Sequence, residues 1–101
     1  MIIERNEFRI KFGKMKDVLR IWNAIFDEFK NVKDRPKMRI LTDLSGPSYT
    51  LVLELELRDF IQIGFKNYQW MTKDSIAKMY QEFVPLCESS TRTFYNVENE
   101  E

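Results

Sequence analysis

A run of alternating leucines in the stretch SYTLVLELELRD, residues 48–59, constrains the fold more than any other feature of the chain. Apolar and polar side chains alternate there at almost every residue, and a period of two is that of a β-strand with one buried face. We therefore predict an antiparallel sheet that packs one face on a core and leaves the other face polar. The apolar face consists of Leu51, Leu53, Leu55 and Leu57, and the other of Thr50, Val52, Glu54, Glu56 and Arg58.

Two longer segments have the period of an amphipathic helix, with apolar residues at intervals of three and four. The first predicted helix runs from about residue 14 to 31. The second continues to Cys87 after a candidate cap at residue 72, 74 or 75, and Pro85 should kink or thin its final turn. The two apolar stripes consist of Met15, Val18, Leu19, Trp22, Ile25, Phe26 and Phe29, and of Ile76, Met79, Tyr80, Phe83, Val84 and Cys87.

Further strands are predicted over residues 2–12, 37–44 and 91–97. The first of them places Phe8, Ile10 and Phe12 on one face. Gly46 and Pro47 are turn residues, so the second strand and the leucine strand should form a hairpin. The segment 59–70 fits either a short helix or a strand, and we prefer the helix. Residues 98–101 are expected to be a frayed tail.

The predicted order is strand, helix, strand, strand, helix, strand. With right-handed crossovers this order indicates one α+β domain over residues 1–101, a ferredoxin-like βαββαβ sandwich whose four-stranded antiparallel sheet carries both helices on one face. The leucine face, with Phe8, Ile10 and Phe12, should then pack under the helices. The first and third strands become neighbours, which brings a charged row near Glu54 and Glu56 on the uncovered face. That row is Arg5, Glu7, Arg9 and Lys11.

Charge and cysteine content exclude several classes of protein. The chain has 16 basic and 16 acidic residues among 101, so no net field attracts it to nucleic acid or to an anionic membrane. The glutamates of the leucine strand would also repel RNA, where an RNA-recognition module of the same fold order presents aromatic residues. Cys87 has no cysteine to pair with, and neither a signal peptide nor an apolar run of about 20 residues is present. We expect a cytoplasmic protein.

The chain resembles the dimeric α+β barrel superfamily, which includes the NIPSNAP-like proteins and the antibiotic-biosynthesis monooxygenases. The resemblance rests on the element order over residues 2–97, on the aromatic first helix VLRIWNAIFDEF and on the ending YQEFVPLCESSTRTFYNV. It implies a homodimer that stacks its open sheet faces into a barrel. It also implies a ligand cavity inside that barrel or between the sheet and the helices. It transfers no catalytic residue, because haem-degrading members use an axial histidine and this chain has none.

The absence of histidine also removes the commonest general base and transition-metal ligand, and we predict neither a metal nor a cofactor. Cys87 continues an apolar stripe, which favours a packed thiol over a nucleophile. Glu54 and Glu56 point the same way on a strand, and adjacent arginines should hold both ionised rather than split their pKa values. Arg9 needs a carboxylate or an anionic ligand if a dimer buries it.

Members of the superfamily that oxidise polyphenols work through polar groups around a bound substrate. Asn6, Trp22 and Tyr95 supply such residue types here, although Trp22 also fits a core position. Two classes of function stay open. The favoured one is a small-ligand-binding or interaction module, not an enzyme, whose dimer cavity holds an anionic or aromatic metabolite near Arg9 and Glu54. The alternative is a cofactor-independent monooxygenase or isomerase that acts on an aromatic substrate.

Overall fold

The computed structural model of the protein describes residues 1–32, 35–58 and 74–101. Its elements follow one another in the predicted order. The helix preferred for residues 59–70 lies outside the described residues. The elements are β1 (Ile2–Ile10), α1 (Met15–Phe29), β2 (Lys37–Thr42), β3 (Thr50–Leu57), α3 (Asp74–Phe83), the short 3₁₀ helix η2 (Val84–Leu86) and β4 (Cys87–Asn96).

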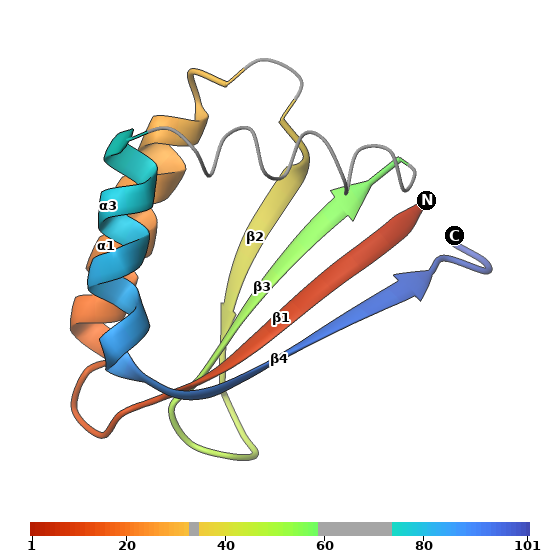
Figure 1. Ribbon diagram of the computed structural model, residues 1–101. Coiled ribbons are helices and arrows are strands. Elements are labelled where there is room, and N and C mark those ends of the chain that lie inside the picture. Colours follow the sequence, from red (N-terminus) through yellow and green to blue (C-terminus); the bar gives the residue numbers. More distant parts are fainter. Residues whose placement is uncertain (33–34, 59–73) are drawn as a thin grey trace.

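The strands form one antiparallel sheet in the order β2-β3-β1-β4, which confirms that the first and third strands are neighbours. Residues opposite each other in a strand pair point to the same face, so the register decides which side chains meet. Leu51 lies opposite Phe8, and Glu54 lies opposite Arg5 on one side and Arg39 on the other. Figure 1 shows α1 and α3 side by side on one side of the sheet, as expected for a ferredoxin-like sandwich.

The core lies between the leucine face and the two helices. The four leucines of β3 are buried, and Val18 of α1 and Ile76 of α3 have no exposed surface. Phe83 joins the layers, because its ring makes edge-to-face contacts with Phe8 of the sheet and Trp22 of α1. Each such side chain contributes roughly 1.5–3 kcal/mol through burial. None of the described helices is both long and apolar enough to cross a membrane.

The prediction that Phe12 packs in the core is wrong. β1 ends at Ile10, and the backbone then turns through Gly13, whose φ of 76° favours glycine. Strand alternation therefore no longer governs the direction of the Phe12 side chain. Phe12 is 82% exposed and contacts the ring of Tyr49 at a centroid distance of 5.4 Å.

The second helix ends earlier than its apolar pattern predicted. α3 stops at Phe83, and the next turn tightens into η2 around Pro85, as expected for a proline near a helix end. Val84 is consequently exposed and does not continue the apolar stripe. Cys87 begins β4 instead of ending a helix, and β4 starts four residues before the predicted strand.

Leu51→Ala and Leu44→Ala remove the same atoms from opposite environments, because Leu51 is fully buried and Leu44 is fully exposed. We expect Leu51→Ala to lower the free energy of unfolding by about 2–5 kcal/mol and Leu44→Ala by less than about 0.5 kcal/mol. Urea denaturation followed by tryptophan fluorescence measures both losses. Equal losses would contradict this assignment of the core.

Candidate functional site

The sheet has a second face, which points away from α1 and α3 (Figure 1). We call it the open sheet face. Residues of β1 with odd numbers and residues of β3 with even numbers share it, because the register sets them opposite one another. Its central residues are Ile3, Arg5 and Glu7 of β1, Lys37, Arg39 and Leu41 of β2, Val52, Glu54 and Glu56 of β3, and Thr91, Thr93 and Tyr95 of β4.

Glu54 is the centre of the open sheet face and is held by two arginines. Its Oε2 accepts hydrogen bonds from Nε (2.9 Å) and Nη2 of Arg5, and its Oε1 accepts hydrogen bonds from Nε (2.8 Å) and Nη2 (2.6 Å) of Arg39. The Glu54 side chain is 5% exposed, whereas those of Arg5 and Arg39 are 41% and 65% exposed. Two forked contacts therefore use both carboxylate oxygens, an arrangement that arginine geometry favours.

The pKa of Glu54 reflects two opposing effects. Burial favours the neutral carboxyl and raises the pKa, but hydrogen bonds from Arg39 and Arg5 and their positive charges lower it by more. The pKa of Glu54 consequently lies below its ordinary value of 4.5. The hydrogen bond to Glu54 in turn raises the pKa of Arg5. Glu54 is thus ionised at neutral pH, as predicted for a carboxylate beside arginines.

Apolar and aromatic side chains surround this cluster. The Arg5 guanidinium carbon lies 5.7 Å from the centre of the Tyr95 ring, a cation–π distance. Ile3 lies opposite both Glu56 and Tyr95, and Val52 lies opposite Leu41. The open sheet face therefore has a centre of one carboxylate and two arginines with apolar side chains beside it.

Arg9 does not reach Glu54. It lies opposite Thr50, four residues along β1 from Arg5, and its Nε is 4.0 Å from a carboxylate oxygen of Glu88. Both side chains of this ion pair are about half exposed, so it adds little to stability. The sequence placed the row from Arg5 to Lys11 near Glu54 and singled out Arg9. The structure pairs Glu54 with Arg5 of that row and with Arg39, which was not named as a partner from the sequence.

A second polar cluster lies on the opposite face of the sheet, the one that carries the buried leucines of β3. Asn6 Nδ2 donates a hydrogen bond to Glu4 Oε2 at 2.7 Å, and Arg92 Nε donates one to Asn6 Oδ1 at 3.1 Å. Arg92 Nε is also 3.9 Å from Glu4 Oε2. We call these three residues the helix-side cluster. The Glu4 side chain is 7% exposed and that of Arg92 is 56% exposed, so the cluster extends from the interior to the surface.

Glu4 was not among the predicted site residues, although the sequence carries a signal for it. Glu4 and Asn6 have the same parity as Phe8 and Ile10 on β1, so a polar pair interrupts the apolar face of a strand. Buried polar groups in such positions need partners. Here Glu4 and Asn6 are partners of each other and of Arg92.

Trp22 and Cys87 are packed residues. Trp22 is 3% exposed, between the rings of Tyr80 and Phe83, and its indole Nε1 has no hydrogen-bond partner among the described residues. Burial raises the pKa of the Cys87 thiol to about 11 despite the nearby charge of Lys11. The thiol is therefore protonated at neutral pH, which agrees with its interpretation as a packing residue.

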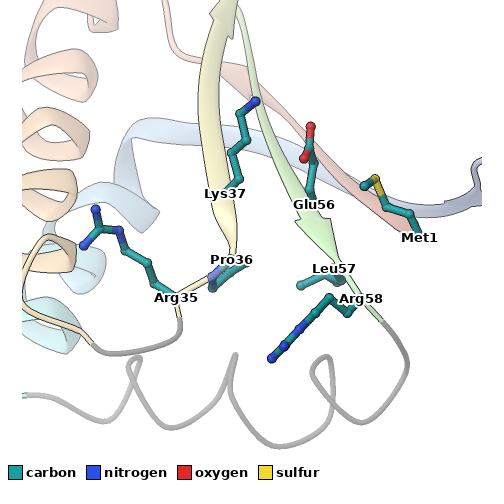
Figure 2. Close-up of a pocket in the computed structure, with 7 residues that line it drawn as sticks. All are labelled: Met1, Arg35, Pro36, Lys37, Glu56, Leu57 and Arg58. Atoms are coloured by element: carbon teal, nitrogen blue, oxygen red, sulfur yellow. The ribbon is translucent and has the colours of Figure 1, made fainter. Parts of the chain in front are cut away.

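Two hollows flank the start of β2. One, of about 470 Å³, lies between the start of β2 and the end of β3 (Figure 2). The other, of about 420 Å³, lies between the end of α1 and β2, and Arg35, Pro36 and Lys37 border both. Within the described ranges, no group of acidic or cysteine side chains is placed to hold a metal ion.

Comparison of the whole chain with solved structures finds the same fold in several proteins. A NIPSNAP domain protein from Burkholderia xenovorans is 19% identical, with 96% of this chain and 94% of that chain covered and a TM-score of 0.79. A NIPSNAP family protein from Agrobacterium tumefaciens is 16% identical, with 94% of this chain and 90% of that chain covered and a TM-score of 0.78. SnoaB, described as a cofactor-independent oxygenase from Streptomyces nogalater, is 9% identical, with 98% of this chain and 94% of that chain covered and a TM-score of 0.73.

No family model matches the sequence, and no curated protein matches it. The likeness is therefore one of structure. It confirms that the chain has the α+β fold shared by NIPSNAP domains and antibiotic-biosynthesis monooxygenases. That fold is the one that the element order and the resemblance predicted.

Because the pKa of Glu54 is lowered by folding, its contribution to stability is present at neutral pH and decreases in acid. A carboxyl whose pKa is lower in the folded chain stabilises the fold above its unfolded pKa, and this contribution is lost as the pH falls through the folded value. We expect Glu54→Gln to lower the free energy of unfolding by about 1–3 kcal/mol at pH 7 and by clearly less at about pH 3. Urea denaturation at the two pH values measures the difference.

Glu82→Gln is the matched control for this substitution, because Glu82 is exposed on α3. It should change the stability little at either pH. A loss for Glu54→Gln that is the same at both pH values would show that ionisation of Glu54 does not support the fold.

Proposed function

We propose that the protein is a homodimeric small-ligand-binding module whose two copies stack their open sheet faces. The observation that supports this most strongly is the buried Glu54 carboxylate on a face turned away from both described helices. A carboxylate that is paired and hydrogen-bonded at both oxygens can lose its remaining water in an interface, because its charge is already compensated.

The composition of the open sheet face supports the same conclusion. The cores of protein interfaces are enriched in arginine and aromatic residues, and unpaired charges are scarce there. Arg5, Arg39 and Tyr95 supply the first kind of residue, and Glu54 neutralises one of the two arginines. Ile3 and Val52 are half-buried apolar residues that a second copy would cover further.

We place the ligand on the other side of the sheet, at the helix-side cluster. Glu4 supplies acceptors, Arg92 supplies donors and Asn6 supplies both, which suits an aromatic molecule with hydroxyl or carbonyl groups. Phe94 lies opposite Glu4 on β4 and is 41% exposed, so an aromatic surface adjoins the cluster. The location agrees with the expectation of a ligand between the sheet and the helices and differs from the one near Arg9.

Val52→Lys tests the dimer. Val52 lies opposite Leu41 at the middle of the open sheet face, and an ammonium group there would have to lose its water in the interface. We expect the wild-type protein to sediment at twice the 12.2 kDa of one chain at micromolar concentration, and Val52→Lys to weaken dimerisation by at least about tenfold.

Ala24→Lys introduces the same group on the exposed side of α1 and should leave the dimer intact. Far-ultraviolet circular dichroism confirms the fold of both variants. A wild-type protein that sediments as a monomer, or a dimer that Val52→Lys leaves unchanged, would refute the proposed interface.

The helix-side cluster also supports a second candidate, a cofactor-independent oxygenase for aromatic substrates. A carboxylate enclosed beside an amide and a guanidinium has the groups needed to accept a proton from a phenol and to orient the resulting anion. The structural likeness to SnoaB, itself described as a cofactor-independent oxygenase, supports this candidate at the level of fold.

Oxygen uptake with a panel of polyphenols tests the second candidate. If the protein is such an enzyme, Glu4→Gln should lower kcat by about 10²-fold, because the amide no longer accepts the proton, while Glu82→Gln should have no effect. Uptake no faster than in buffer for every polyphenol, or equal rates for the two variants, would reject Glu4 as the base of an oxygenase.

A further inference from the structure

The hollow between α1 and β2 has an apolar wall and a basic margin. Phe26 and Phe29 of α1 face Met38 of β2 across it, with Pro36 beside them. Lys30 and Arg35 stand at its margin. Its volume of about 420 Å³ lies within the range of roughly 300–1,000 Å³ that is usual for small-molecule sites, and the mixture of an apolar lining with a few polar groups is also typical.

The neighbouring hollow at the strand ends continues this basic character. Figure 2 shows the Arg58 side chain extending from the end of β3. The side chains of Lys37 and Glu56 point together in the opposite direction. Arg35 extends toward α1 from the position just before Pro36, at the boundary of the two hollows. The two hollows therefore meet at Arg35, Pro36 and Lys37, and together we call them the β2 trough.

Positive charge exceeds negative charge in the β2 trough. Among the described residues that line it, Lys30, Arg35, Lys37 and Arg58 are cationic and Glu56 is anionic. Lys30 is already paired with Asp27 at 3.1 Å. Arg35 uses one donor of its guanidinium, Nη1, on the carbonyl oxygen of Phe29 at 3.0 Å.

The bond from Arg35 to Phe29 also orients the arginine. The carbonyl oxygen of Phe29, at the end of α1, accepts hydrogen bonds both from Arg35 Nη1 at 3.0 Å and from the backbone N–H of Val32 at 2.9 Å. By donating to it, Arg35 fixes its own direction beside the aromatic wall, and its remaining N–H groups keep the geometry that matches a carboxylate. A fixed guanidinium beside an apolar wall is the arrangement that recognises an anion with a hydrophobic body.

We propose that the β2 trough binds a small organic carboxylate, with its apolar body against Phe26 and Met38 and its carboxylate at Arg35. The Lys37 side chain points with Glu56 to the open sheet face, away from this apolar wall, so the carboxylate is assigned to Arg35. This site is separate from the helix-side cluster, and it requires neither the dimer nor an oxygenase activity.

Titration of isotope-labelled full-length protein with naphthoate, followed by amide shifts in nuclear magnetic resonance spectra, tests the proposal. We expect saturable shifts at Phe26, Lys37 and Met38 with a Kd of about 1 mM or below. The neutral ester, methyl naphthoate, should bind at least about tenfold more weakly, because a charge-assisted hydrogen bond is lost. Inorganic phosphate, which lacks an apolar body, should not displace naphthoate at equal concentration.

Arg35→Ala should weaken naphthoate binding by at least about tenfold. Arg20→Ala removes another exposed arginine, on α1 away from the trough, and should change naphthoate binding by less than about twofold. The melting temperatures of both variants show whether the fold is kept, and Arg35→Lys should retain part of the binding if charge alone suffices.

Three results would overturn the proposal. The first is equal binding by the Arg35→Ala and Arg20→Ala proteins. The second is equal binding of the acid and its ester. The third is a set of shifts confined to Asn6, Arg92 and their neighbours, which would assign the anion to the helix-side cluster instead.

Discussion

The antiparallel pairing of β3 with β1 is the constraint on which the rest of the structure depends. It sets Leu51 opposite Phe8 and Glu54 opposite Arg5, and because the period of a strand is two, these pairs point to opposite faces. A register shift of one residue would expose the leucines and bury the glutamates. The fold is therefore specified by the apolar face, and the same specification places a carboxylate beside two arginines on the other face.

The buried carboxylates on the two faces of the sheet, Glu54 and Glu4, have different surroundings. Glu54 receives four hydrogen bonds from two arginines, so its charge is fully compensated and one positive charge is left over. Glu4 lies on the face of the buried leucines, where it contacts the Asn6 amide and the half-exposed Arg92. The first arrangement holds a charge in one state and suits an interface. The second leaves polar groups next to an exposed aromatic ring and suits contact with a ligand.

Much of this architecture was predictable because it rests on local periodicity. The alternation of Leu51 to Leu57 and the helical stripes of Trp22 and Phe83 define the two layers, and the element order then defines the sheet. The failures occurred where periodicity ends. Phe12 lies beyond the last residue of β1, and Cys87 lies beyond Pro85, so neither follows the pattern of the preceding element.

The candidate sites were less predictable, because they depend on register and not on period. Period alone places Arg5, Arg9 and Glu54 on one face. The register sets Arg5 opposite Glu54 but Arg9 opposite Thr50 and Ser89, and Arg9 pairs with Glu88 at the register shift of β4. Asn6, Tyr95 and Trp22 were all named from the sequence. The structure puts them in three places, namely the helix-side cluster, the open sheet face and the core.

The claim that the open sheet face joins two copies is tested most directly by isotope-filtered nuclear Overhauser spectra on a mixture of labelled and unlabelled protein. The account predicts intermolecular cross-peaks from the methyl groups of Val52, Leu41 and Ile3, because these surround the Glu54 cluster on one face. Their absence in a sample that is dimeric by mass, with cross-peaks arising instead from residues of the helices, would contradict it.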